Sequence, residues 1–199
     1  MAYEANRPVK TTVKTFEILE QLSRRDRIRL SALAAELDVS KGIIHNHLST
    51  LRELGYVRKV DDHYQLSAKL LGVGFRARSH SQLFTAAHTP LLDIADRFDT
   101  GVILCEPAAG DCIVIDAQQL PAGIETTVGT TIPISTSLVG QVIDSRTATA
   151  SEATEPSSAY DSAAIEEAVD EHGYAVGPIT SETAVDCVAV PILGEAGDC

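Results

Sequence analysis

The stretch SALAAELDVSKGIIHNHLSTLRELGYVRKV, residues 31–60, decides the fold of the first half of the chain. It holds two short amphipathic segments on either side of a tight turn at Asp38 and Val39. We expect Ser31 to cap a first short helix that runs through Leu37, because a serine hydroxyl accepts a hydrogen bond from a free N–H of the first turn. Two helices joined by so short a turn are typical of a helix-turn-helix.

The second helix of this pair has the stronger signals. Ser40 is in position to cap its start, and Gly55 suits the left-handed residue that ends a helix. Its apolar residues form a single stripe that we expect to face the preceding helix: Ile44, Leu48, Leu51 and Leu54.

The flanking segments complete the pattern of a winged helix-turn-helix. Residues 9–23 have the spacing of a helix, and its predicted apolar stripe is Val13, Phe16, Leu19 and Leu22. The basic run RRDRIR, residues 24–29, is expected to be a loop. Residues 56–60 and 63–67 are strand-like and are separated by two aspartates, which predicts a hairpin.

The exposed face of the second helix predicts a DNA contact. Helical phase places short or hydrogen-bonding residues there: Lys41, Gly42, His45, Asn46 and Ser49. In a helix-turn-helix this face enters the major groove, where asparagine pairs with adenine and lysine with guanine or a phosphate. The predicted phosphate contacts, which position the protein without reading bases, are Arg24, Arg25, Arg27, Arg58 and Lys59. The alternative is a winged module that binds another protein.

Beyond residue 67 the pattern changes to that of a connecting helix and a second domain. The helical pattern up to residue 88 is interrupted by glycines and suits a helix that pairs with a second copy. Thr89 before Pro90 predicts the start of a new helix. We therefore divide the chain into a DNA-binding domain at 1–77, a linker and dimerisation helix at 78–89 and a regulatory domain at 90–199.

The second domain is predicted to mix helices and strands, so the fold class is α+β. A strand pair with a short turn is expected at 101–105 and 112–116. The other predicted elements are strands at 124–134, 174–176 and 187–193, helices at 137–144 and 163–173, and a polar loop at 147–162.

The two halves differ strongly in charge. Residues 1–80 hold 14 Lys and Arg against 9 Asp and Glu, whereas residues 81–199 hold 2 against 19. A basic half is expected to bind a polyanion, here double-stranded DNA, which the acidic half would repel. The acidity resembles that of proteins from extreme halophiles, and an ordinary acidic surface is the alternative.

Several function classes lack support in the sequence. There is no glycine-rich phosphate loop, no GxSxG and no HExxH, so we expect no enzyme. The four cysteines have no spacing typical of zinc, and we expect neither a metal nor a cofactor. The start MAYEANRPVKTT has no apolar leader region, and no apolar run approaches a membrane span, which predicts a cytoplasmic protein.

The chain resembles the IclR-type transcriptional regulators. The resemblance is carried by residues 30–59 and 63–74 in the first half, and by VGTTIPISTSLVGQVI (128–143), AIEEAVDEHGYAV (164–176) and VDCVAVPI (185–192) in the second. It implies a homodimer or homotetramer, a winged DNA-binding domain and a GAF-like effector-binding domain for small organic acids or aromatics. Taken with the acidity, it suggests a regulator from a halophilic archaeon that represses or activates genes.

Some positions depart from the family pattern. Ile43, Asn46 and His47 stand where the family often has threonine, arginine and an aliphatic residue. The resemblance gives four candidate effector contacts: Leu138, Val139, Val185 and Cys187. The first two replace a small Gly-Ala pair whose amides meet a carboxylate, and Gly177 matches a pocket acid. The sequence stops at Cys199, before the family's paired pocket serines, so we expect either a shortened sequence or a lineage that has lost part of the sensor.

The cysteines leave a redox alternative open. With a four-residue loop after Glu106, Cys105 and Cys112 would lie opposite each other across the strand pair, where the two thiols could form a disulfide or share a metal ion. Together with Cys187 they would make a redox-responsive regulator, whereas packed, reduced thiols are the simpler interpretation.

Overall fold

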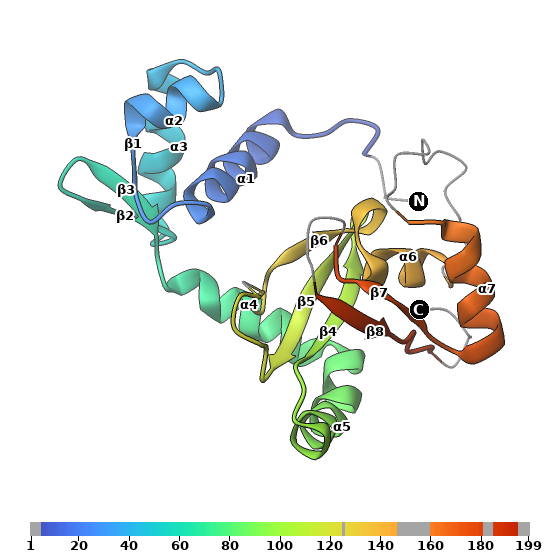
Figure 1. The fold of residues 1–199 in the computed structure, drawn as a ribbon. Helices are drawn as coiled ribbons and strands as arrows, with labels where there is room; N and C mark the ends of the chain where they lie inside the picture. Colours follow the sequence, from blue (N-terminus) through green and yellow to red (C-terminus); the bar gives the residue numbers. More distant parts are fainter. Residues whose placement is uncertain (1–4, 125, 147–159, 181–184, 195–199) are drawn as a thin grey trace. The chain divides into compact units, whose positions relative to one another are not determined.

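The computed structural model describes residues 5–124, 126–146, 160–180 and 185–194. The chain divides into two compact units between Ser79 and His80, shown in Figure 1. Each unit has its own core, and the α+β class predicted from the sequence is confirmed.

The N-terminal unit is a winged helix-turn-helix. Its elements are α1 (Lys10–Ser23), β1 (Ile28–Arg29), α2 (Leu30–Glu36), α3 (Lys41–Glu53), β2 (Val57–Val60) and β3 (His63–Leu66). The three strands form an antiparallel sheet in the order β1-β3-β2, and the β2–β3 hairpin is the wing. The core joins all three helices to this sheet, and its buried residues are Ile18, Leu22, Ile28, Leu33, Ala34, Ile44, Leu48, Leu51, Val57 and Tyr64.

The predicted signals at the turn and around α3 are confirmed. Asp38 in the turn has a φ of 49°, and Gly55 after α3 has a φ of 80°, the left-handed conformation expected of it. The Ser40 hydroxyl accepts a hydrogen bond of 3.3 Å from the Ile43 N–H and so caps α3. Local sequence is thus sufficient to place this helix.

Four predictions for this unit were wrong in detail. Ser31 lies inside the first turn of α2, because β1 pairs with β3 up to Arg29 and the helix begins directly after it. For the same reason the basic run is not entirely a loop. Leu54 is 51% exposed because α3 ends before it. Val13 and Phe16 are exposed because α1 turns the stripe of Ile18 and Leu22 to the core.

The C-terminal unit contains two antiparallel sheets covered by helices. After α4 (Lys69–His80), its elements are α5 (Gln82–Phe98), β4 (Val102–Ala108), β5 (Asp111–Gln118), β6 (Thr131–Pro133), the 3-10 turn η1 (Ile134–Thr136), α6 (Leu138–Asp144), α7 (Ser162–His172), β7 (Ala175–Pro178) and β8 (Asp186–Ala189). The sheets have the orders β4-β5-β6 and β7-β8. Helix α5 packs on β4 and β5, and α6 and α7 pack on β7.

The start of α5 corrects the predicted linker. The helix begins after Ser81, whose hydroxyl accepts from the Phe84 N–H at 3.1 Å, and it continues through Pro90. The same hydroxyl donates to Glu106 at 2.8 Å, which fixes the cap against β4. Residues 78–89 therefore comprise the end of α4, Ser81 and the first half of α5, and do not form one helix.

The strands of this unit also differ from the prediction. The β4–β5 turn has only two residues, Ala109 and Gly110, both with positive φ as in a type I′ hairpin. In the resulting register Cys105 pairs with Val114, so it does not lie opposite Cys112 as predicted. Of the expected strand 124–134 only β6 forms. Most of the predicted polar loop, residues 147–159, lies outside the described residues.

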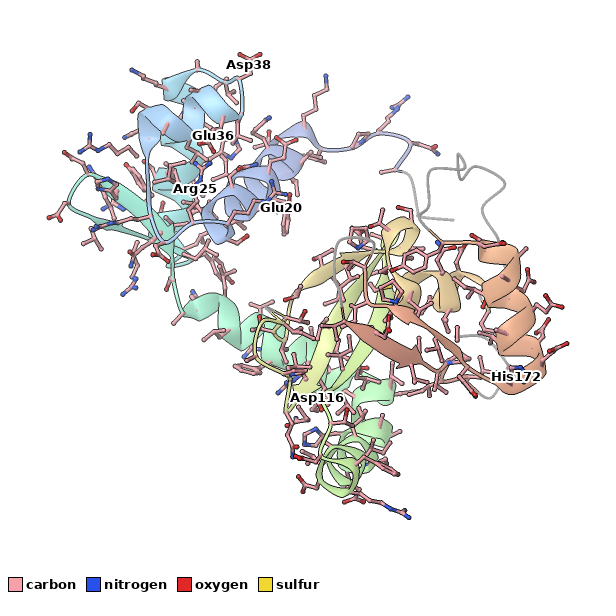
Figure 2. The ribbon with its side chains drawn as sticks, in the orientation of Figure 1. Glu20, Arg25, Glu36, Asp38, Asp116 and His172 are labelled. Atoms are coloured by element: carbon pink, nitrogen blue, oxygen red, sulfur yellow. The ribbon has the colours of Figure 1, made fainter. Side chains whose placement is uncertain are left out.

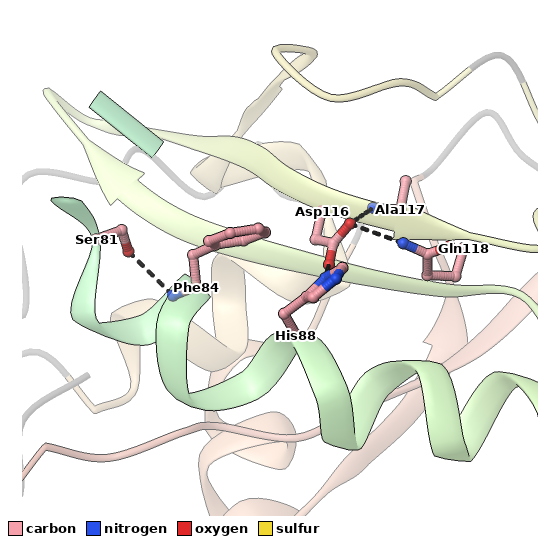
Figure 3. A network of polar contacts seen from close by, with 6 residues as sticks. All are labelled: Ser81, Phe84, His88, Asp116, Ala117 and Gln118. Atoms are coloured by element: carbon pink, nitrogen blue, oxygen red, sulfur yellow. Dashed lines mark hydrogen bonds and ion pairs between the residues drawn. The ribbon is translucent and has the colours of Figure 1, made fainter. Parts of the chain in front are cut away.

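A buried carboxylate joins α5 to β5 (Figure 3). Asp116 is 3% exposed and lies 2.5 Å from Nδ1 of His88, while the Ala117 N–H and Gln118 Nε2 donate to its other oxygen, both at 3.0 Å. Burial opposes its ionisation, but these hydrogen bonds outweigh burial and hold the pKa of Asp116 below its usual value. The network thus accommodates a charge inside the acidic unit.

Candidate nucleic-acid interface

Helix α3 exposes the whole polar face predicted from its sequence. Ile44, Leu48 and Leu51 are buried, and the opposite side carries Lys41, Gly42, His45, Asn46 and Ser49, all exposed. An alanine Cβ at Gly42 would meet only the Ser40 hydroxyl, at 4.0 Å, so the surface beside this glycine is open. An exposed face of short and hydrogen-bonding side chains permits close approach of a DNA groove.

The two residues beside this face have different environments. Ile43 is 45% exposed and adds an apolar patch of the kind that contacts a thymine methyl. His47 lies on another side of the helix, with Nδ1 2.9 Å from the hydroxyl of Thr15 on α1. Its ring therefore links two helices, and His45 and His47 do not form a ligand pair.

A basic depression lies beside the α3 face, between α2, α3 and the wing. It has a volume of about 410 Å³, and its lining residues are Arg29, Leu30, Ser31, His45, Arg52, Lys59, Asp62 and Tyr64. The buried Tyr64 lies on its wing side, with the Lys59 ammonium 5.7 Å from the ring centroid and 3.7 Å from Asp62. A concave surface with two arginines, a lysine and a histidine suits a phosphate group.

Arg29 and Arg52 were missed by the sequence-based prediction. Arg52 follows His45 by seven residues and Ser49 by three, so helical phase alone was a sufficient signal for it. Arg29 had no such signal, because it reaches the depression through the pairing of β1 with β3, between residues more than 30 positions apart.

The predicted phosphate contacts are exposed but differ in their partners. Arg24, Arg25 and Arg27 lie between α1 and β1, and Arg58 and Lys59 lie on β2. The Arg25 guanidinium forms an ion pair with Glu36 of α2, as Figure 2 shows. Arg25 would have to share its charge between this carboxylate and a phosphate.

Replacing Arg29 or Arg52 with alanine is expected to weaken DNA binding equally for different sequences. Each variant should lower the dependence of log affinity on log salt by about 1, the slope expected for one lost phosphate contact. Fluorescence anisotropy across a salt series measures this. Arg76→Ala, which removes an exposed arginine of α4, is the control. A slope unchanged from the wild type in both variants would exclude the depression from the interface.

A second candidate site is a cavity of about 760 Å³ in the C-terminal unit. It is bounded by α5, β4, α6, the β7–β8 sheet and the residues that follow β8. Three of the four predicted effector residues line it: Val139, Val185 and Cys187. Leu138 does not, because it is 1% exposed and packs in the core with Val142 and Ile165.

The thiols of this unit are poorly suited to redox chemistry. Burial, followed by the neighbouring Cys112 and Cys187, raises the pKa of Cys105 to about 12. Burial and the Asp186 carboxylate raise the pKa of Cys187 as well. Reactive cysteines need the opposite, a lowered pKa. In the part of the chain that the structure describes, no group of three or more His, Cys, Asp or Glu side chains is placed to hold a metal ion.

The fold and the interface define a class. Residues 11–61 match the family model of the IclR helix-turn-helix domain. With its winged fold and exposed polar α3 face, the chain is a DNA-binding transcriptional regulator whose N-terminal unit has an IclR-type helix-turn-helix domain. Within the described residues, no helix has the length and apolar character needed to span a membrane.

Two curated relatives are similar to this chain. The HTH-type transcriptional regulator KdgR of Escherichia coli is 24% identical over 216 residues, which cover 95% of this chain and 78% of KdgR. The probable HTH-type transcriptional regulator ArcR of Halobacterium salinarum is 32% identical over 79 residues, which cover 39% of this chain and 30% of ArcR.

Solved structures show the same fold over almost the whole chain. The IclR transcriptional regulator from Alicyclobacillus acidocaldarius has a TM-score of 0.79 at 21% identity, and the match covers 96% of this chain and 85% of that one. An IclR homologue from Microbacterium hydrocarbonoxydans, complexed with 4-hydroxybenzoate, has a TM-score of 0.72 at 15% identity, covering 94% of this chain and 85% of that one. At these identities the likeness establishes the fold alone.

Proposed function

We propose that this protein binds operator DNA as a dimer through α3 and the wing, and that its C-terminal unit senses a small molecule that controls this binding. The observation that carries the proposal is the polar face of α3 beside a basic depression, in a unit that matches the IclR helix-turn-helix domain. The acidic C-terminal unit would repel DNA, so we assign it a role other than DNA binding.

Each part of the interface has a proposed role. Lys41, Gly42, His45, Asn46 and Ser49 contact base edges. Arg24, Arg25, Arg27, Arg58 and Lys59, together with Arg29 and Arg52, contact phosphates. The proposed domains are the DNA-binding domain 1–77 and the GAF-like regulatory domain 90–199, joined through residues 78–89, which span the end of α4 and the first half of α5.

Helix α4 supports a dimer. The proposed oligomer is this dimer or a tetramer made of two such dimers. None of its residues is buried within the chain, and it exposes Leu71, Val73 and Phe75 to 59%, 48% and 51%. A helix that exposes three large apolar side chains is suited to packing against a second copy. Two α3 helices would then read two half-sites of an inverted repeat.

The cavity of the C-terminal unit supports a sensor. Its volume and largely apolar wall are those of small-molecule sites. By analogy with the family, the effector proposed from the sequence is a small organic acid or an aromatic compound, and Val139, Val185 and Cys187 would contact it. A redox-responsive regulator is the less favoured reading, because the pKa values of Cys105 and Cys187 are raised.

The charge of the second half supports the proposed halophilic archaeal origin, and a cytoplasmic location is proposed with it. Residues 81–199 hold 19 acidic side chains and only 2 lysines or arginines. Such a surface keeps a protein soluble in concentrated salt, and one similar protein comes from Halobacterium salinarum. High salt weakens phosphate contacts, so the proposed specificity depends on contacts to bases and on binding of both half-sites.

The test is genome-wide mapping of the DNA bound by the tagged protein in its native salt. We expect discrete peaks that share an inverted repeat, and their loss in a Lys41→Ala/Asn46→Ala double variant. Glu53→Ala, an exposed change at the end of α3, is the matched control and should keep the peaks. Equal enrichment in the wild type and the double variant would favour the protein-binding adaptor over the regulator.

A further inference from the structure

We propose that the cavity of the C-terminal unit binds a neutral, apolar small molecule and discriminates against carboxylates. The inference rests on the proposed role of this unit as a sensor and narrows its ligand class. It departs from the small organic acid expected by analogy, and the reasons lie in the wall of the cavity and in the charges around it.

The described wall is apolar. The cavity of about 760 Å³ is large enough for a molecule of two aromatic rings, since small-molecule sites span about 300–1,000 Å³. The side chains that line it are mainly leucine, isoleucine, valine and proline, contributed by every element around it. Among the described lining residues, the polar ones are Thr100, Thr126, Asp186 and the thiols of Cys105 and Cys187.

Among the described residues that line the cavity, a carboxylate would find no lysine or arginine. The sequence from residue 81 to residue 199 contains only two lysines or arginines, Arg97 and Arg146. Neither lines the cavity: Arg146 pairs with Asp170 at 2.7 Å, and the Arg97 guanidinium lies 5.4 Å from the Phe98 ring centroid. The charged residue that does line the wall is Asp186, which would repel an anion.

The histidines of the unit give no better partner. His88 is bound to Asp116 at 2.5 Å, and His172 on α7 lies 3.8 Å from Glu171. Neither of these residues lines the cavity, and nor does His80, the third histidine of the unit. An anionic ligand therefore has no side chain to neutralise it, and burial of an unpaired charge is costly.

Two backbone N–H groups at the start of α6 are also engaged. The Leu138 N–H donates to the Ile179 carbonyl at 3.2 Å, and the Gly140 N–H donates to the Ser137 hydroxyl at 3.0 Å. These N–H groups at the start of the helix are satisfied within the protein and are not free to receive a carboxylate.

The raised pKa values of the two lining thiols indicate that the wall of the cavity disfavours negative charge. The pKa of Cys105 is raised to about 12, first by burial and then by the neighbouring Cys112 and Cys187. Burial is also the main reason that the pKa of Cys187 is raised. Both side chains line the cavity, so a ligand carboxylate placed among them would meet the same unfavourable environment.

The test uses two fluorescent probes with one skeleton. N-phenyl-1-naphthylamine is neutral, and 8-anilino-1-naphthalenesulfonate is the same molecule with a sulfonate. Both gain fluorescence in an apolar site. Titration of the full-length protein should give an affinity for the neutral probe at least about tenfold higher than for the sulfonate, because the unpaired charge is penalised.

A matched pair of variants locates the site. Val185→Lys places a cation at the wall, at a residue that is 37% exposed. It should lower the affinity for the neutral probe and raise the affinity for the sulfonate. Val128→Lys is the same change at a residue 44% exposed that does not line the cavity, and it should leave both affinities unchanged. Circular dichroism checks that both variants are folded.

Three results would overturn the inference. The first is that the wild type binds the sulfonate as tightly as the neutral probe, or more tightly. The second is that the two lysine variants change the probe affinities equally. The third is that neutral-probe binding is lost at high protein concentration, because a second copy covers the cavity. Operator binding, measured separately by anisotropy, tests the proposed function. If the neutral probe binds as expected but leaves operator affinity unchanged, the ligand class stands and the sensor role fails.

Discussion

Replacing Gly140 with alanine is expected to destabilise the C-terminal unit strongly, although alanine is the better helix former. An alanine Cβ at this position in α6 would meet the Cα and the carbonyl oxygen of Ile134, and its carbonyl carbon at 2.7 Å. These are backbone atoms of η1 and do not move aside as a flexible side chain would. The same carbonyl accepts from the buried Gln141 side chain at 3.1 Å, which further fixes it.

We expect the free energy of unfolding of this unit to fall by about 3 kcal/mol or more, the upper range for overpacking a core. Thermal unfolding followed by circular dichroism should show its midpoint lowered by on the order of 10 °C. Gly74→Ala is the control, because a Cβ at this position of α4 has no neighbour within 4 Å. It should be neutral or raise stability by up to about 1 kcal/mol. Equal midpoints for the two variants would contradict the close approach of η1 and α6.

The fold was most predictable where the signals are local. The Ser40 cap, the left-handed Gly55 and the period of Ile44, Leu48 and Leu51 lie within one helix and its ends, and all three were confirmed. The same locality explains why the exposed face of α3 followed directly from helical phase.

Predictions failed where distant pairing decides the outcome. Arg29 joins the basic depression through the pairing of β1 with β3, which no local pattern reveals. The relation of Cys105 to Cys112 depends on the number of residues in a turn, and a change from four to two shifts the register. Leu138 and Val139 are neighbours in sequence, but only Val139 lines the cavity, since the helix turns Leu138 into the core.

Two predicted helix boundaries were wrong for a related reason. Thr89 and Pro90 have the sequence of a helix start, but Ser81 caps α5 and is held by Glu106 of β4, so the helix begins earlier and runs through the proline. The hydrogen bond between Ser81 and Glu106 thus decides which of the two possible start positions the helix uses. Leu54 is a comparable case at the other end of a helix, where apolar periodicity continues beyond the residues that are packed.

Truncation of Leu48 is the second prediction with a large expected effect, and Leu54 supplies its control. Leu48 is 0% exposed in the core of the N-terminal unit, where α3 meets the other helices and the sheet. Leu48→Ala removes buried apolar surface and leaves a cavity, which costs about 2–5 kcal/mol for leucine. Because α3 carries the proposed base contacts, operator affinity should fall together with the stability of this unit.

Leu54→Ala should cost no more than about 0.5 kcal/mol, because this side chain is 51% exposed. Its carbonyl accepts from the Lys69 ammonium at 2.6 Å, and that contact survives the change of side chain. Urea unfolding of both variants, with the slope compared as well as the midpoint, measures the difference. Sequence periodicity alone predicts similar losses for the two leucines, whereas the structure predicts a difference of several-fold in the free energy lost. A cost for Leu54→Ala close to that for Leu48→Ala would show that α3 packs along its whole apolar stripe, including the residue after its last turn.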